Sequence, residues 1–100
     1  MRLARVCGTV VATVKADGLA RHKLLLLQDV DAANPQGKPS HAESYVAVDL
    51  IGAGEGEIVL VTLGSGARID SGSEGVPTDA AVIAIVDSVQ VGTETTFVKH

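Results

Sequence analysis

Apolar and polar side chains alternate over most of residues 4–15. A period of two residues is the spacing of side chains on one face of a β-strand. The alternation therefore predicts an N-terminal strand, and Ala16-Asp17-Gly18 supplies the turn after it. One face of this strand would carry Ala4, Val6, Gly8, Val10 and Ala12, and the other Arg5, Cys7, Thr9, Thr13 and Lys15.

Further apolar segments have strand character and are separated by stretches rich in Gly, Pro, Ser and polar residues. The predicted strands cover 23–28, 45–49, 58–63 and 82–91, and residues 95–98 could add a short terminal strand. One helical turn is expected at 77–81, with Thr78 or Asp79 as its cap. Five or six strands with one short helical turn predict an all-β fold, a small closed antiparallel β-barrel, because closure removes exposed strand edges.

Three of the predicted strands are apolar on both faces. They include residues 24–27, 58–61 and 82–86. A strand buried only on the inside of a barrel would alternate, and the chain offers no amphipathic helix to cover the outside. At ~25 cal/mol per Å² of apolar surface, one exposed strand face leaves several kcal/mol of burial unused. We therefore expect a homo-oligomer formed through barrel walls; the alternative is that the outer residues pack under the long loops.

Composition narrows the choice of partners. The chain has 100 residues, of which 46% are hydrophobic and 2% aromatic, and it carries a net charge of −4. It is long enough for a single domain over residues 1–100, with the polar segment around 31–44 as a flexible loop. The acidic balance and the two aromatic residues argue against nucleic acid. The apolar runs fall far below the ~20 residues of a membrane-spanning helix, which argues against a membrane.

Candidate catalytic and metal-binding chemistry is weak. Cys7 is the single cysteine, so it forms no intrachain disulfide, and a small cysteine in a strand is more often a packing residue than a nucleophile. A single cysteine suits a reducing compartment, and the N-terminal segment is unlike a secretory signal. Together these observations predict a cytosolic protein. The three histidines are spread along the chain, and no G-x-S-x-G motif is present. We predict no enzyme activity, no cofactor and no metal.

Two glycine-rich segments are candidate anion sites. In Gly52–Glu57, a strand follows the glycines and two glutamates would repel an anion, so a tight bend is the better interpretation. In Gly64–Arg68, small residues stand beside a guanidinium. Arg68 either binds an anion or forms an ion pair with a carboxylate on a neighbouring strand or subunit, and we favour the ion pair.

Several of these segments, taken in order, resemble one protein family. They are Met1–Val11, Lys23–Gln28, Val48-Asp49 with Gly52–Gly54, Val59–Val61 leading to Gly64–Arg68, and Pro77–Asp87. Each is unspecific alone, but the ordered set spans nearly the whole chain. On these residues the sequence resembles the EutN/CcmL family, the vertex proteins of bacterial microcompartments.

This resemblance implies a structural protein with an OB-like β-barrel. Family members form pentamers that cap the vertices of polyhedral shells, in carboxysomes or metabolosomes within the cytoplasm. The implied partners are further copies of the chain and the hexameric and trimeric facet proteins of the shell. The residues expected at the subunit interface are Gly64, Ser65, Gly66 and Arg68. The alternative is an OB-type binding module, monomeric or oligomeric, for a small ligand or an oligonucleotide.

Overall fold

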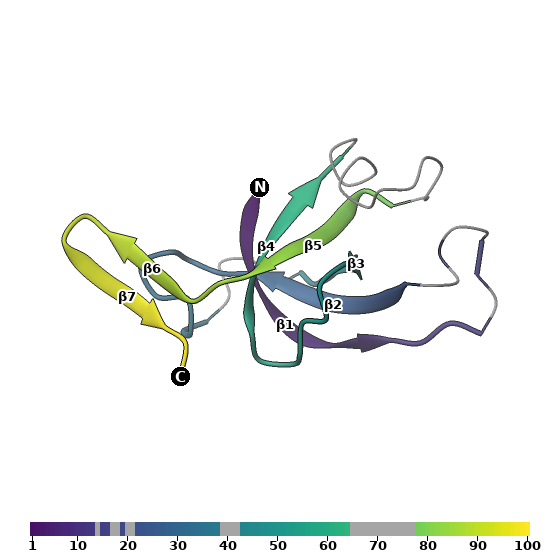
Figure 1. Cartoon of the computed structure of the whole chain (residues 1–100), viewed down its shortest axis with the longest axis horizontal. Coiled ribbons are helices and arrows are strands. Elements are labelled where there is room, and N and C mark those ends of the chain that lie inside the picture. The colour runs from purple at the N-terminus through teal and green to yellow at the C-terminus, as the bar shows by residue number, and fades with distance from the viewer. Residues whose placement is uncertain (14, 17–18, 20–21, 39–42, 65–77) are drawn as a thin grey trace.

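The computed structural model describes residues 1–13, 15–16, 19, 22–38, 43–64 and 78–100. Within these residues the chain forms seven β-strands and no helix (Figure 1). No described helix is therefore long and apolar enough to cross a membrane. The strands are β1 (Arg2–Val10), β2 (Lys23–Asp29), β3 (Tyr45–Asp49), β4 (Ile58–Leu63), β5 (Ala80–Ile85), β6 (Ser88–Val91) and β7 (Glu94–Val98).

Five strands close into a barrel in the order β1-β2-β3-β5-β4, which confirms the predicted fold class. Four of the five pairings are antiparallel, but β3 and β5 pair in parallel through Val48↔Ala81 and Asp49↔Val82. The expectation of a wholly antiparallel barrel was wrong for a geometric reason. Strand directions cannot alternate all the way around a closed ring with an odd number of strands, so one pairing must be parallel.

The barrel interior is filled by small aliphatic side chains. Their relative exposures are at most 2%. A five-stranded barrel has a narrow interior, and Val, Leu and Ala fill it, with Tyr45 and Ile85 packed against them. Such a core needs few aromatic residues. The core consists of Ala4, Val6, Leu25, Leu27, Ala47, Ala53, Val59, Val61, Ala80 and Val82.

A β-bulge after Val6 divides β1 into two parts. Val6 pairs with Leu27, whereas Gly8 pairs with Leu26, so one residue of β1 has no partner on β2. Side chains beyond the bulge therefore point to the opposite face from the one that simple alternation predicts. Gly8 and Val10 lie on the outer face, and an added Cβ at Gly8 would meet the Leu26 Cβ at 3.8 Å.

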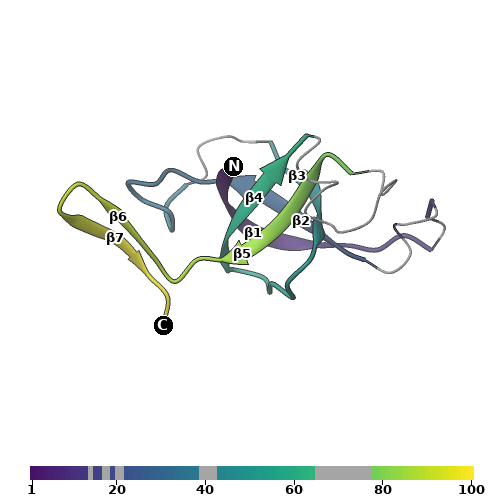
Figure 2. The same cartoon turned by 45° about the horizontal axis from the view of Figure 1, so that its top comes forward.

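The C-terminal hairpin stands apart from the barrel. The predicted strand 82–91 is interrupted at Val86 and Asp87, and β6 pairs only with β7, the predicted terminal strand. Gly92, with φ 60°, takes the first central position of the two-residue turn between them, the pattern of a type II′ turn. Figures 1 and 2 show the hairpin projecting from one end of a molecule that measures 45 × 23 × 23 Å.

The helical turn predicted at 77–81 does not form in the described part of that segment. Ala80 and Ala81 already belong to β5. Thr78 adopts a local turn instead, in which its Oγ1 accepts a hydrogen bond from the Ala80 amide at 3.2 Å. A threonine hydroxyl offers this bond at the start of a strand as readily as at a helix cap, and the run of seven apolar residues from Ala80 to Val86 favours the strand.

Candidate assembly surfaces

The outer faces of β2 and β3 carry an apolar surface, here called the first wall. It consists of Leu24, Leu26 and Val46. Leu24 and Leu26 are partly exposed, while the alternate residues of β2 are buried in the core. Leu26 pairs with Val46, whose exposure is 43%. The expectation that 24–27 is apolar on both faces of the sheet is confirmed.

A second apolar surface, the second wall, lies on β4 and β5. It consists of Leu60, Ile83 and Ala84, all partly exposed. Leu60 pairs with Ala84, and a register shift leaves Ile83 without a partner on β4. On one side of the barrel β1 separates β2 from β4, and on the other side β3 of the first wall pairs with β5 of the second, so the two walls are distinct but neighbouring faces of the barrel.

A third part of the outer surface is covered by the chain itself. Ile58 pairs with Arg5 on the outer face of the barrel, yet its exposure is only 1%. Phe97 of β7 packs against it together with Val30, and Val89 of β6 borders the same cluster. The alternative that outer residues pack under other segments therefore holds for Ile58, but the cover is the C-terminal hairpin rather than a long loop.

One of the four predicted interface residues lies in the described part of the chain. Gly64 has φ 65°, a left-handed conformation that favours glycine, and its amide donates to the Asp79 carbonyl at 2.8 Å. This bond joins the described ends of the segment between β4 and β5. Ser65, Gly66 and Arg68 lie outside the described residues, so the proposed ion pair of Arg68 stays a prediction.

A polar network that sequence reasoning missed lies at the barrel end where β1 begins. The Arg2 Nη1 donates to Asp29 Oδ2 at 2.8 Å, and the Tyr45 hydroxyl donates to Asp29 Oδ1 at 2.7 Å. Asp29 is buried, whereas the Arg2 side chain is 54% exposed. No sequence spacing relates the three residues. They meet because β2 lies between β1 and β3.

Burial and the Asp29 carboxylate shape the acidity of Tyr45. Desolvation is the largest cause that raises the pKa of Tyr45, followed by the hydrogen bond to Asp29 and the negative charge of that carboxylate. The positive charge of Arg2 offsets part of this rise. The network borders a cavity of about 500 Å³, which is lined by Arg2, Tyr45, Val46, Leu63, Asp79 and Ala80.

The segment Gly52–Glu57 is a tight bend stabilised by carboxylates. Asp49 Oδ1 accepts hydrogen bonds from the amides of residues 51, 52 and 53 at 3.0–3.3 Å. Glu57 Oε1 accepts the Gly54 amide at 2.6 Å. Amides that already donate to carboxylates are not available to a phosphate, which supports the bend over an anion site.

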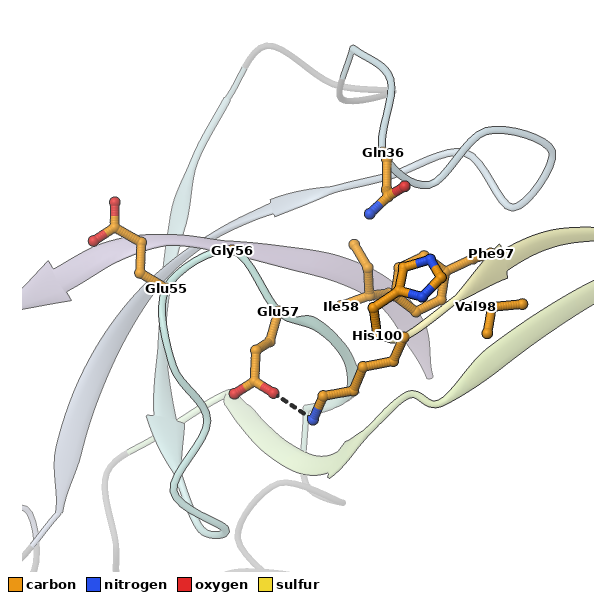
Figure 3. A pocket seen from close by; sticks show the side chains of 9 residues that line it. Gln36, Glu55, Gly56, Glu57, Ile58, Phe97, Val98 and His100 are labelled. Atoms are coloured by element: carbon orange, nitrogen blue, oxygen red, sulfur yellow. Dashed lines mark ion pairs between the residues drawn. The ribbon is translucent and has the colours of Figure 1, made fainter.

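A groove of about 360 Å³ lies where this bend meets the hairpin (Figure 3). Ile58 and Phe97 contribute apolar side chains to it, and Glu57 and Lys99 also line it. The Lys99 Nζ is 2.7 Å from Glu57 Oε2. The hydrogen bond to Lys99 is the largest cause that lowers the pKa of Glu57, and the same bond raises the pKa of Lys99.

Cys7 lies at the bulge of β1 and is partly exposed. Its Sγ donates to the Leu26 carbonyl at 3.3 Å, a contact that suits the packing role expected for it. Among the described residues, no group of three or more His, Cys, Asp or Glu side chains is placed to hold a metal ion.

The chain is similar to proteins of one family over nearly all of its length. The EutN_CcmL family, described as "Ethanolamine utilisation protein EutN/carboxysome", matches residues 1–87. The shell vertex protein EutN of Escherichia coli K12 is 48% identical over 99 residues, which cover 99% of this chain and 100% of the relative. The carboxysome shell vertex protein CcmL of Synechocystis is 45% identical over 101 residues, covering 100% and 96%.

A solved structure extends the similarity to three dimensions. The pentameric microcompartment shell protein GrpN of Rhodospirillum rubrum has a TM-score of 0.78 and 42% identity, and the match covers 92% of this chain and 100% of GrpN. The family match ends at residue 87, one residue before β6 begins. The family description thus covers the barrel, and the similarity to EutN of Escherichia coli, over 99% of this chain, extends into the hairpin.

Proposed function

The chain belongs to the EutN/CcmL family, and from this premise we propose that five copies join side by side into a ring that caps a vertex of a bacterial microcompartment shell. Closed shells of hexagonal tiles need five-fold units to introduce curvature. The function is therefore geometric: the ring fills a corner that a hexagonal tile cannot fill. Its partners in this role are the hexameric and trimeric facet proteins around it.

The two walls carry this proposal. A cyclic ring of five uses a heterologous contact, in which one surface of each copy meets a different surface of the next. The barrel has two such surfaces, the first wall on β2 and β3 and the second wall on β4 and β5. Both are apolar and partly exposed in a single copy. We propose that the first wall of one copy packs on the second wall of its neighbour.

The segment that starts at Gly64 is proposed to add a second contact between subunits. Gly64 and Asp79 lie at one end of the barrel, beside Leu63 at the end of β4. The described ends of this segment lie at the edge of the second wall, which places the segment well to meet the next copy. Ser65, Gly66 and Arg68 would make this contact, with Arg68 paired to a carboxylate of the neighbour.

We propose no catalytic role for the chain. Arg2 and Tyr45 line the cavity at the barrel end, and both are engaged with the buried Asp29. Asp29 accepts from both Arg2 and Tyr45, so its two oxygens are already used. A tyrosine hydroxyl is already protonated at neutral pH, and burial and this pairing raise the pKa of Tyr45 further. A structural network fits this arrangement better than a general base or a nucleophile.

Two matched substitutions test the ring. Val46 in the first wall and Val91 in the hairpin have exposures of 43% and 45%, so Val46→Glu and Val91→Glu make the same change at equal exposure. Native mass spectrometry should give five copies for the natural chain and for Val91→Glu. Val46→Glu should give mainly single copies, because a charge would be buried in the contact between walls.

Other masses would reject parts of the proposal. Six, three or one copies for the natural chain would reject the vertex role. Five copies for Val46→Glu would leave the ring in place but move its contact away from the first wall. Electron microscopy of shells co-expressed with facet proteins tests the capping step. Closed polyhedra are expected with the natural chain, and unclosed shells with Val46→Glu.

A further inference from the structure

The hairpin and the barrel are separate sheets. The barrel ladder closes on itself, and within the described part of the chain β6 and β7 pair only with each other (Figures 1 and 2). The chain passes from one sheet to the other through Val86 and Asp87 alone. A two-stranded hairpin is marginally stable in water and needs another surface to pack on. The position of this hairpin is therefore set by its contacts with the barrel.

The apolar part of those contacts is small. Phe97 is the single residue of the hairpin that is buried, with an exposure of 7%. It packs with Ile58 and Val30 of the barrel side, and Val89 and Leu3 border the cluster. The tip lies beyond this cover, because Val91 is 45% exposed. The burial of one aromatic ring removes much less apolar surface from water than the burial of the ten residues of the barrel core.

Polar contacts complete the junction. The Thr96 Oγ1 donates to the Ala32 carbonyl at 2.6 Å, and the Val86 amide donates to the Ile58 carbonyl at 2.9 Å. The Lys99 amide donates to the Asp87 carbonyl at 2.7 Å, which closes the base of the hairpin upon itself. The ion pair between Lys99 and Glu57 is the contact that joins this base to the bend before β4 (Figure 3).

Glu57 is fixed on the barrel side of that pair. Its Oε1 accepts the Gly54 amide, and its carbonyl accepts the Val6 amide at 3.0 Å. Lys99 follows β7 and is tied through its amide to Asp87 at the base of the hairpin, so it would move with the hairpin rather than with the barrel. The two side chains are 24% and 41% exposed, so salt screens their attraction. Such an ion pair favours the observed position of the hairpin by a small free energy and does not prevent the hairpin from moving away.

We propose that the β6–β7 hairpin opens from the barrel as one unit, with the Glu57–Lys99 ion pair as the latch that favours its closed position. Opening breaks the junction at Phe97 and leaves both sheets intact. It uncovers Ile58 on the outer face of the barrel. The contacts that carry this proposal lie within one chain, so it does not rest on the number of copies in the ring.

Hydrogen exchange on the whole assembled protein tests this device. Amides that pair β6 with β7 should exchange together and faster than amides of the barrel ladder, because a local opening costs less than global unfolding. Glu57→Gln keeps an oxygen for the Gly54 amide and removes the charge from the latch. It should raise the exchange rate of hairpin amides about two- to five-fold, the range expected for an exposed ion pair.

Glu55→Gln is the matched control. It introduces the same change, Glu to Gln, two residues away from Glu57. Glu55 has no hydrogen bond or ion pair among the described residues. In the Glu55→Gln variant, the hairpin amides should exchange at the same rate as in the natural chain. The barrel amides are the internal reference for folding in every variant. Equal protection of hairpin and barrel, or equal exchange in the two variants, would overturn the proposal.

Discussion

The barrel and the C-terminal hairpin are both built from short, mostly aliphatic strands, but they are stabilised differently. Each barrel strand has two neighbours, and ten residues fill a common interior. Each hairpin strand has one neighbour, and one aromatic ring secures the pair to the barrel. The same kind of sequence thus produces a cooperative unit in one region and a dependent one in the other. Closure of the ladder makes the difference.

The outer surface shows a second contrast. Leu26 and Ile58 both face outward from strands that are apolar on both faces. Ile58 is covered by Phe97 of its own chain, whereas Leu26 stays partly exposed beside Val46. A strand that is apolar on both faces therefore predicts that its outer face is buried, but it does not predict which molecule buries that face. In this protein the hairpin supplies one cover, and we propose that a neighbouring copy supplies the other.

The largest expected effect is a truncation inside the barrel. Leu27→Ala removes a fully buried side chain, and its loss should lower the free energy of unfolding by about 2–5 kcal/mol. Urea denaturation followed by circular dichroism, at one protein concentration, measures this. Val11→Ala, outside both walls at a side chain that is 88% exposed, is the control, and its loss should be about 0.5 kcal/mol or less. Equal losses would contradict the placement of Leu27 in the core.

A truncation in the hairpin should affect the barrel much less. Phe97→Ala removes the buried ring of the junction, so protection of hairpin amides should fall to nearly that of an unfolded chain. The free energy of unfolding of the barrel should change by about 0.5 kcal/mol or less, as for a substitution outside the cooperative unit. Hydrogen exchange and urea denaturation measure the two parts. A loss as large as that of Leu27→Ala would mean that the two sheets unfold together.

Much of the fold was predictable because local pattern and global fold agree in the barrel. Alternation and apolar runs located all five barrel strands and the last hairpin strand. The errors came from features that alternation does not record. The bulge after Val6 adds a single residue and reverses the face of Gly8 and Val10. The break at Val86 and Asp87 is not marked by glycine or proline, so the sequence reads as one continuous strand.

The sequence predicted that the barrel carries apolar outer surfaces, but it did not predict the polar network at the barrel end. Two-faced strands predicted apolar outer walls, and Leu26 and Leu60 bear this out as partly exposed outer residues. The network of Arg2, Asp29 and Tyr45 had no signal in the sequence. Its members are brought together by strand register, which depends on the whole barrel. Their spacing along the chain carries no information on that register.

The smallest expected effect is the alkaline response of this network, and it contrasts a buried polar contact with the exposed latch of the hairpin. The pKa of Tyr45 is raised in the folded state, so its contribution to stability is complete below pH 10 and is lost as pH rises through the folded pKa.

Tyr45 is the only tyrosine and the chain has no tryptophan, so absorbance near 295 nm reports its ionisation alone. The folded protein should ionise at higher pH than the protein in urea. Asp29→Asn should lower the pKa of Tyr45 only in part, because desolvation is the largest cause of the shift and remains in the variant. A folded protein that ionises at the same pH as the unfolded chain would show that water reaches the hydroxyl and that the barrel end is as open as the hairpin junction.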